Sequence, residues 1–252
     1  MTTKQVSTIL LILSLTILAI ILTATPAHSS TNVNILTHTG YLDTLGYYHV
    51  VGEVQNTADT ALNFIKITAV FYNSTDAVIA TLNAYPMIDV LHPGRKSPFS
   101  ILLYNTQVHY YTLTLATSYV TDPLPLGLEI LSQNCTVDIS GTMHITGQIK
   151  NVGSERATSV ESLATFYNAS GNVVAVSSGY STPSDLDPGQ TAPFEIILLS
   201  SRAPYVSTYA LDAQSVQYAS VPEFTQWTLA ALTLATISAV TMKYRKNNRN
   251  AL

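Results

Sequence analysis

Three asparagines of this sequence stand in the triplet that accepts N-linked sugar. The sequons begin at Asn73, Asn134 and Asn168. Such an asparagine is modified in an exported protein when its triplet lies in an exposed loop. Asn73 and Asn168 are each followed by small and polar residues typical of a hairpin loop. Glycosylation is therefore expected first at these two positions, with Asn134 as the third candidate.

Two histidines, His49 and His144, are the next residues with possible chemistry, and they are related by a spacing that recurs along the chain. A metal site needs several ligands that converge at bonding distance. Each histidine shares its expected strand face only with Glu53 or with Gln148. We interpret both as surface histidines, and we expect no metal and no cofactor.

A pair of carboxylates, Asp185 and Asp187, flanks a Pro-Gly turn and leaves Ca²⁺ as an open alternative. Val90 and His92 stand at the equivalent positions of the first copy of the repeat described below. Calcium is bound by many oxygen atoms, so two carboxylates alone do not predict a site.

Catalytic patterns are not apparent in the sequence. Cys135 is the single cysteine, which excludes a disulfide framework and a CxxC metal site. Its equivalent in the other copy is Gly40, so we interpret it as a small, semi-buried residue. No nucleophile–base pair recurs and no glycine-rich phosphate loop occurs, and the protein is predicted not to be an enzyme.

The elements that position these residues are set by an internal duplication. A shift of 95 residues, as from Phe71 to Phe166, superposes two long stretches without a gap. A repeat of this size indicates two structural units rather than one. The matched residues are Gly52, Asn56, Phe71, Tyr72, Asn73, Leu91, Pro93, Gly94, Pro98 and Phe99 in the first copy, and Gly147, Asn151, Phe166, Tyr167, Asn168, Leu186, Pro188, Gly189, Pro193 and Phe194 in the second.

Apolar residues alternate with polar ones in both copies, which is the pattern of half-buried strands. Within Tyr48–Gln55, for example, Val50 and Val54 share one face, and His49 and Glu53 share the other. Strands separated by turns at short intervals indicate an antiparallel β-sandwich with an immunoglobulin-like layout. We therefore predict an all-β protein of two tandem sandwiches, with no helix between residues 28 and 221.

The charge distribution argues against nucleic acid as a partner. Only 10% of the residues are charged, and the region from His28 to Val221 holds fourteen acidic but six basic side chains. Phosphate binding needs clustered cations on the folded part of a protein. Here the clustered cations Lys243, Arg245, Lys246 and Arg249 lie at the end of the chain.

The two ends of the chain predict export and a membrane anchor. Lys4 precedes an apolar run over 9–22, and small residues then lead to an expected cleavage after Ala27, as in a secretory signal peptide. An uncleaved anchor is the alternative. Near the other end, the apolar segment 227–242 is bounded by Trp227 and by a basic cluster, which marks the cytoplasmic side of a membrane span.

The expected organisation follows directly. It comprises a signal peptide (1–27), a first β-sandwich (31–121), a Pro-rich linker (122–127), a second β-sandwich (128–220), a motif segment (221–226), a transmembrane helix (227–242) and a basic cytoplasmic tail (243–252).

The repeated pattern of Gly-x-Val/Ile-x-Asn, Phe-Tyr, Leu-x-Pro-Gly and Pro-Phe resembles the FxLYD family of bacterial and archaeal extracytoplasmic β-sandwich domains. Asn73 and Asn168 stand where that family commonly has aspartate. The resemblance implies a surface-located binding or spacer module without catalytic residues.

The C-terminal segment is similar to the PEF-CTERM class of archaeal protein-sorting signals. Pro222, Glu223 and Phe224 form the tripeptide, and a hydrophobic span and a basic cluster follow it. The resemblance implies that an archaeosortase-like membrane transpeptidase removes the tail and transfers the protein to another anchor. A plain C-terminal anchor remains the alternative.

These observations together predict a non-catalytic adhesion, binding or spacer module, exported and held at the membrane or cell surface. Its C-terminus is expected to be cytoplasmic before any processing. The expected partners are the membrane and a surface protein or polysaccharide, contacted through the tyrosine-rich stretches 47–48 and 110–111. The alternative is an accessory or ligand-sensing subunit of a membrane complex, which would keep its span.

Overall fold

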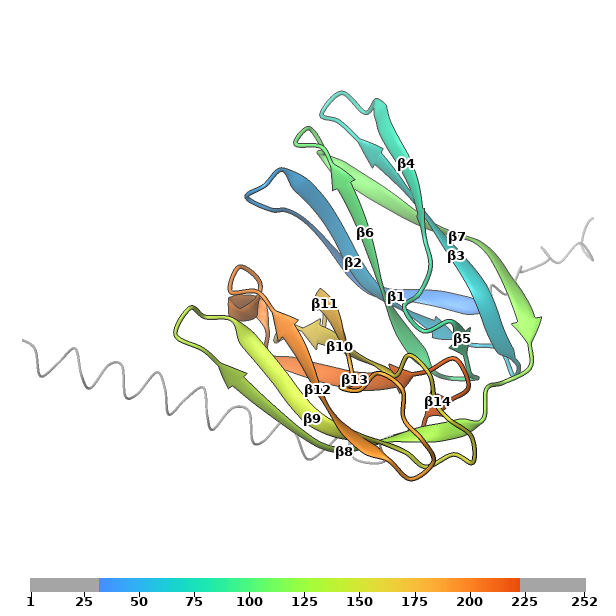
Figure 1. Cartoon of the computed structure of the whole chain (residues 1–252). Helices are drawn as coiled ribbons and strands as arrows, with labels where there is room; N and C mark the ends of the chain where they lie inside the picture. Colours follow the sequence, from blue (N-terminus) through green and yellow to red (C-terminus); the bar gives the residue numbers. More distant parts are fainter. Residues whose placement is uncertain (1–31, 223–252) are drawn as a thin grey trace, which may run out of the picture. The chain divides into compact units, whose positions relative to one another are not determined.

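The computed structural model describes residues 32–222, which belong to one compact unit (Figure 1). This part of the chain is all-β, as predicted, and it contains no α-helix; a short 3₁₀ helix, η1 (Ala203–Tyr205), is its one helical turn. The strands are β1 (Val33–Leu42), β2 (Tyr47–Asn56), β3 (Ala61–Tyr72), β4 (Val78–Ala84), β5 (Val90–Leu91), β6 (Lys96–Tyr104), β7 (Tyr110–Thr121), β8 (Leu126–Val137), β9 (Met143–Asn151), β10 (Glu161–Tyr167), β11 (Val173–Tyr180), β12 (Thr191–Leu198), β13 (Thr208–Gln214) and β14 (Ala219–Ser220).

The first copy of the repeat contributes two sheets that enclose an apolar core. One sheet has the strand order β1-β2-β6, and β3 of the other pairs with β4, β5 and β7. Alternate residues of β2 and β3 point between the sheets, because side chains alternate across a strand. Val50 and Val54 of β2 thus meet Ile67 and Phe71 of β3 in one buried cluster. Two sheets packed face to face in this way are consistent with a β-sandwich.

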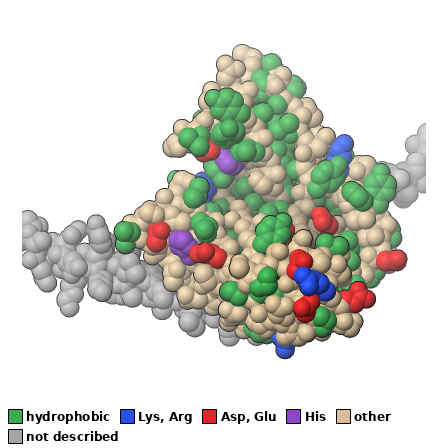
Figure 2. Space-filling view, viewed as in Figure 1, with side chains coloured by type: hydrophobic (Ala, Val, Ile, Leu, Met, Phe, Trp, Pro, Cys, Tyr) green, Lys and Arg blue, Asp and Glu red, His purple; other side chains and the backbone are tan. Residues whose placement is uncertain are grey.

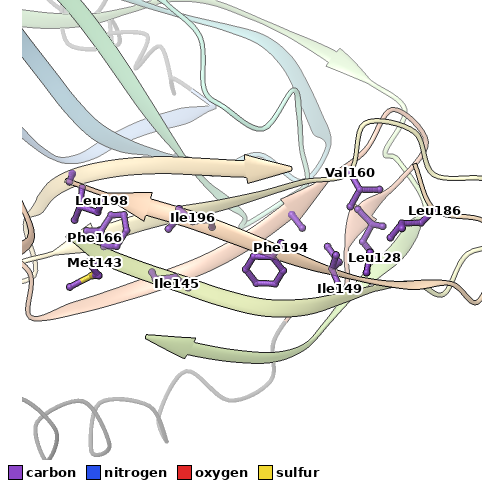
Figure 3. Close-up of a cluster of buried hydrophobic side chains, with 14 of the residues drawn as sticks. Leu128, Met143, Ile145, Ile149, Val160, Phe166, Leu186, Phe194, Ile196 and Leu198 are labelled. Atoms are coloured by element: carbon purple, nitrogen blue, oxygen red, sulfur yellow. The ribbon is translucent and has the colours of Figure 1, made fainter. Parts of the chain in front are cut away.

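The second copy forms a single seven-stranded sheet that folds over its own core. Its order is β11-β10-β13-β14-β8-β9-β12, and the two-residue strand β14 joins the two halves. Figure 3 shows the core side chains between the ribbons, with Phe166 of β10 near Leu198 and Phe194 of β12 farther along, toward Ile149. The strand β8 begins at Leu126, which pairs with Ala219 of β14, so it already includes part of the stretch expected as a linker.

Equivalent residues of the two copies occupy equivalent positions in the strand pairing, apart from one insertion in the second copy. Phe71 pairs with Tyr111 across β3 and β7, and Phe166 pairs with Tyr209 across β10 and β13. Tyr209 is thus the structural equivalent of Tyr111, three residues beyond the shift of 95 that aligns the earlier strands. The three-residue helix η1 lies in the connection that precedes β13 and accommodates this difference.

A buried asparagine fastens the Leu-x-Pro-Gly turn in each copy. Asn151 has no exposed surface, and its Nδ2 donates to the carbonyl oxygens of Leu186 and Glu155, both at 2.8 Å. Its Oδ1 accepts the N–H of Gly153 at 2.9 Å, and its own carbonyl accepts the N–H of Gly189 at 2.8 Å. One side chain therefore holds both the turn and the loop after β9, and it leaves no buried polar atom of its own unpaired.

Asn56 makes the same contacts in the first copy. Its Nδ2 donates to the carbonyl oxygens of Leu91 and Thr60 at 2.8 Å, and its Oδ1 accepts the N–H of Ala58 at 2.9 Å. The carbonyl of Asn56 accepts the N–H of Gly94 at 3.0 Å. We call this set of bonds the asparagine clasp.

The glycine of the repeated Gly-x-Val/Ile-x-Asn pattern is required by close packing. A Cβ atom added to Gly147 would overlap the ring of Phe194 and the carbonyl oxygen of Ser132. A Cβ atom added to Gly52 would overlap the ring of Phe99. The motif thus couples one strand position without a side chain to an aromatic ring on the paired strand.

One expectation about exposure is wrong. The face of β2 that carries Val51 and Glu53 was expected to be the polar outer face of a half-buried strand, yet these residues are only 2% and 4% exposed. The outer face of β2 is covered by the second copy, since β2 contacts β11, and Leu163 of β10 belongs to the core cluster of the first copy. Alternation alone does not reveal that a strand is buried on both faces.

Removal of the asparagine clasp should destabilise the fold. Asn151→Ala leaves two carbonyl groups and one N–H without a buried partner, so the free energy of unfolding should fall by about 3 kcal/mol. Urea unfolding of the full chain in detergent, followed by circular dichroism, measures this difference. Asn172→Ala is the matched control, because Asn172 is exposed and is bonded through its main-chain N–H. It should change stability by less than about 0.5 kcal/mol, and an equally small effect of Asn151→Ala would contradict the assigned role.

Candidate functional site

The two paired sequons lie in hairpin loops, and these loops share one geometry with two others. In the loop at Asn73 the side-chain Oδ1 accepts the N–H groups of Thr75 and Ala77, both at 3.0 Å. In the loop at Asn168 the same atom accepts the N–H groups of Ser170 and Asn172. An asparagine or aspartate that bonds the backbone ahead of it in this way stabilises a tight turn.

Two aspartates hold the remaining hairpins in the same manner. Asp43 Oδ1 accepts the N–H groups of Leu45 and Tyr47 in the β1–β2 loop. Asp138 Oδ1 accepts those of Ser140 and Thr142 in the β8–β9 loop. The fourth residue of each loop has a positive φ, and three of the four are glycine because that conformation strains other residues: Gly46, Asp76, Gly141 and Gly171.

This geometry gives Asn73 and Asn168 a structural role and leaves them compatible with glycosylation. The turn uses the carboxamide oxygen of each asparagine, whereas sugar is attached to the nitrogen. Residues 74–76 and 169–171 after them are exposed. Asn134 differs, since it lies exposed within β8 rather than in a loop.

The histidines at equivalent positions are bound to aspartates that the sequence analysis did not connect with them. His49 Nε2 lies 2.9 Å from Asp43 Oδ2. His144 Nε2 lies 3.4 Å from Asp138 Oδ2, and its Nδ1 lies 2.8 Å from Glu195 Oε1. Each histidine thus braces the aspartate that holds a hairpin, as a structural partner rather than as one member of a converging ligand set.

The hydrogen bonds around His144 and Asp138 shift the pKa values of these two residues in the direction of an ion pair. Hydrogen bonds to Glu195 and Asp138 raise the pKa of His144 above its usual value of 6.5. Hydrogen bonds from Ser140 and Thr142 hold the pKa of Asp138 at about 2. The pair is therefore strongest where His144 is protonated and Asp138 is ionised.

The other candidates for metal binding or reactivity are occupied by structural contacts. Arg156 donates to Asp185 and to Asp187, each at 3.2 Å, and so pairs with both of the carboxylates that left Ca²⁺ open. Cys135 is half-buried beside the second core, and burial raises the pKa of its thiol. Between residues 32 and 222, no group of three or more histidine, cysteine, aspartate or glutamate side chains is arranged to hold a metal ion.

The tyrosine-rich stretches divide between the core and the surface, because they lie on strands. Tyr48 and Tyr111 pack against the first core, and burial raises the pKa of Tyr111 to about 12. Tyr110 is exposed and stacks on Tyr72, with ring centroids 4.7 Å apart. Tyr47 contacts Tyr104, which is 72% exposed. Half of each tyrosine pair thus remains available as a contact surface.

Charged side chains are sparse on the surface, and one ion pair joins the two copies. The face drawn in Figure 2 is mostly uncharged, with scattered acidic and basic groups. Arg95 of the first copy contacts both carboxylate oxygens of Asp212 in the second through its Nη2, at 2.6 and 2.7 Å. It also donates to the carbonyl and the hydroxyl of Ser220 at 2.9 and 2.7 Å.

A second polar contact joins β2 to β10. The hydroxyl of Tyr167 donates to Glu53 Oε1 at 2.6 Å, and Lys96 Nζ lies 3.3 Å from Glu53 Oε2. Burial and the adjacent Glu53 carboxylate raise the pKa of Tyr167 well above its usual range. The buried carboxylate is thereby paired on both oxygens, which is what makes its burial tolerable.

Further contacts tie β1 to β11 and to η1. Thr39 Oγ1 donates to the carbonyl of Val173 at 2.6 Å, and the N–H of Val173 donates to Thr37 Oγ1 at 3.0 Å. The guanidinium of Arg202 lies 3.8 Å from the ring centroid of Tyr41 and also bonds the carbonyl of Val174. Side-chain contacts at several strands therefore join the two copies, in addition to the chain connection between β7 and β8.

A cavity of about 530 Å³ lies at this junction. The charged residues in its walls are Glu53, Arg95, Lys96 and Asp212, and its apolar residues include Leu163. Gln133 of β8 also lines it, and Gln133 Oε1 is buried without a hydrogen-bond donor among the described residues. This cavity is a candidate ligand site that could not be identified from the sequence.

Several sequence-predicted features lie outside the described residues. They are the cleavage site at Ala27, the sorting residues Glu223 and Phe224, and the span 227–242. Pro222, the first residue of the sorting tripeptide, is the last described residue and is exposed. Over 32–222, the structure contains no helix of the length and hydrophobicity that a membrane span requires.

Comparisons with known proteins leave the family open. No protein-family model matches the sequence, and curated proteins give no match. Among solved structures, the chain is similar to the exo-chitosanase CsxA of Amycolatopsis orientalis at 13% identity and a TM-score of 0.30, over 74% of this chain and 26% of the enzyme. It is also similar to red sea bream transglutaminase at 8% identity and a TM-score of 0.26, over 77% of this chain and 33% of the enzyme. This chain therefore spans a third or less of either enzyme, and likenesses at these scores carry no argument.

The junction residues escaped the sequence analysis for an identifiable reason. The two copies were treated as equivalent, whereas the junction uses residues that differ between them. Val51 and Glu53 in the outward set of β2 correspond to Thr146 and Gln148 in β9. The sequence did contain one signal of the junction. Val51 and Glu53 stand on the outer face of β2, whereas the other copy has neither an apolar residue nor a charge at these positions.

Stability should depend on pH through His144. Because the folded-state pKa of His144 is raised, its stabilising contribution is complete below the unfolded value of 6.5 and is lost as the pH rises through the folded-state pKa. His144→Gln should therefore flatten the decline in melting temperature of the full chain above about pH 6.5. His109→Gln, at an exposed loop position, is the control and should retain the decline. An unchanged profile for His144→Gln would show that the pair does not contribute.

The ion pair at the junction should matter more than one at the surface. Arg95→Met leaves Asp212 without its cation in a half-buried position, so the free energy of unfolding should fall by about 3 kcal/mol. The control is Arg156→Met, because the side chain of Arg156 is 57% exposed, and its loss should cost less than about 1 kcal/mol. Chemical unfolding of the full chain measures both, and equal losses would contradict a junction held by Arg95.

Proposed function

We propose that this chain is an exported protein anchored at the membrane or cell surface. In this proposal, two tandem immunoglobulin-like β-sandwiches form a non-catalytic adhesion, binding or spacer module. Several sequence features support it: the apolar N-terminal run before Ala27, the internal repeat, and the apolar segment 227–242 with its basic flank.

The observation that carries the proposal is how the described part of the chain uses its polar side chains. Asn56 and Asn151 hold turns, Asp43 and Asp138 hold hairpins, and Arg95 joins the two copies. Side chains used in this way stiffen a scaffold. A stiff, sparsely charged β-structure with tyrosines at its surface is suited to display and contact.

Two versions of this role differ in whether the C-terminal segment is removed or retained. Removal of the segment after recognition of Pro222, Glu223 and Phe224 by an archaeosortase-like enzyme would give a protein held by a different anchor. Retention of the segment would give a plain transmembrane anchor. Sugar on Asn73 and Asn168 fits either version, because their loops are exposed.

The second candidate is an accessory or ligand-sensing subunit of a membrane complex. The cavity at the junction of the two copies favours it, because a volume of about 530 Å³ lies within the range of small-molecule sites. Such a subunit would keep its membrane span and would co-purify with a partner.

The intact mass of the protein extracted from its native membrane tests the proposal. We expect a chain that begins at His28, and sugar on Asn73 and Asn168 should appear as added mass that an Asn→Gln change at each site removes. A mass that ends near Phe224 and includes an added anchor supports sorting. A mass that retains 227–252 supports the plain anchor and favours the accessory subunit. A protein that is fully soluble after cell breakage would refute the anchored role.

A further inference from the structure

Both ends of the described chain emerge beside an asparagine clasp. At the start, the carbonyl of Asn32 accepts the N–H of Thr57, the residue after the first clasp, at 2.9 Å. At the end, the N–H of Val221 donates to the carbonyl of Leu128 at 2.7 Å, and Leu128 pairs with Asn151 of the second clasp.

The two clasps lie at the same end of the protein. Arg95, in the turn that the first clasp holds, donates to the carbonyl of Ser220 at 2.9 Å, two residues before Pro222. We call this end, which includes β5, β14 and the end of β7, the exit end (Figure 1). The strands run from it to the hairpin loops, so the sequons at Asn73 and Asn168 lie at the opposite end.

The exit end exposes large apolar side chains from both copies. Phe64, Tyr119 and Val216 are each at least 60% exposed. Tyr119 pairs with Asn63, the neighbour of Phe64, and the N–H of Val216 donates to the carbonyl of Thr158 between the second clasp and β10. We call the exposed apolar residues of this end the apolar rim: Phe64, Tyr119, Val120, Leu126, Val152 and Val216.

The fold does not require aromatic residues in the rim. Phe64 has a φ of 45°, a left-handed conformation that strains a bulky residue. Its equivalent in the second copy is Ser159, which has a φ of 54°. Gln217 stands in the place of Tyr119, and its Oε1 accepts the N–H of Thr158 at 2.8 Å. Polar residues thus serve the same backbone in the second copy, and the exposed rings of the first need an explanation outside the fold.

Chain length decides which end of the protein can lie at a membrane. Apolar side chains are also exposed at the hairpin end, as at Leu45 and Ile139, so exposure alone does not decide. Trp227, where the apolar segment 227–242 begins, follows Pro222 by five residues, which span at most about 17 Å. The strand β9 alone covers about 27 Å between the exit end and its hairpin. With the hairpins at the membrane, Pro222 would therefore lie farther from the bilayer than this segment can reach.

We propose that the exit end rests on the lipid surface and that the apolar rim inserts into the interface between headgroups and acyl chains. Aromatic side chains favour this layer, because one end of it is apolar and the other is wet. Charges of both signs lie close to the rim in the chain, at Asp59, Lys66 and Asp122, so the contact is apolar and needs no anionic lipid. The sequons at Asn73 and Asn168 then point away from the membrane. The inference rests on the proposed anchor, and it adds the surface that meets the membrane.

The test uses the full chain in phosphatidylcholine vesicles. Cys135→Ser removes the native thiol, and a single cysteine introduced by Phe64→Cys or Val216→Cys then carries a fluorophore. A lipid with a nitroxide near its headgroup should quench both labels by about twofold or more, because both lie in the interface. The controls Ser74→Cys and Ala169→Cys place the same label in exposed hairpin loops, where it should not be quenched.

An exchange between the copies tests the rim directly. Phe64→Ser combined with Tyr119→Gln introduces the residues that the second copy has at these positions. This variant should lose about half of the quenching of a label introduced by Val120→Cys, because membrane contact scales with the apolar area inserted. The matched control is Leu45→Ser, which makes the same kind of exchange at the hairpin end and should leave the quenching unchanged.

Flotation of the chain with the vesicles reads the anchor separately. A chain that floats while the labels at Phe64 and Val216 remain unquenched would overturn the docking and leave the anchor intact. Equal quenching of the hairpin labels would do the same, because the protein would then lie flat on the bilayer. A chain that does not float would refute the anchor itself, and the inference with it.

Discussion

The rest of the structure depends on the asparagine clasp. A β-protein of this kind must bring a turn back against the end of a strand, and the turn's main-chain groups must find partners away from water. One carboxamide at Asn56, and one at Asn151, supplies two donors and one acceptor at that point. Proline and glycine shape the turn, but the asparagine determines where it is fastened. This is the physical reason why Asn and Leu-x-Pro-Gly recur together in both copies.

The polar groups at the junction are likewise paired with one another. Val51 and Leu163 exclude water, and the charged pairs are placed around them at positions where only one copy has the required residue. An ion pair that is half-buried and hydrogen-bonded on several sides fixes orientation, because its partners tolerate little displacement. The two copies are therefore linked by matching surfaces as well as by the chain between β7 and β8.

Much of the fold could be predicted from the sequence, because alternation and turn chemistry are local signals. The strands around Val50 and Ile145 and the hairpins at Asn73 and Asn168 were expected and are present. The clasp, the His144–Asp138 pair and the junction were not predicted, since each joins residues that lie apart in the chain or on the face assumed to meet water. The sequence shows the same spacing from Asp43 to His49 as from Asp138 to His144. Only the structure shows that each histidine contacts the aspartate of its hairpin.

The junction joins two different surfaces, so each copy retains one surface of the complementary kind. Packing of this head-to-tail type does not close on itself, and repeated between molecules it would produce an open-ended filament. The residues at the equivalent positions do not match those of the junction. Gln148 and Thr191 replace Glu53 and Lys96, and Thr114 stands in β7 where Asp212 stands in β13. The ion pairs that secure the internal contact therefore have no counterparts at the equivalent positions of the other copy.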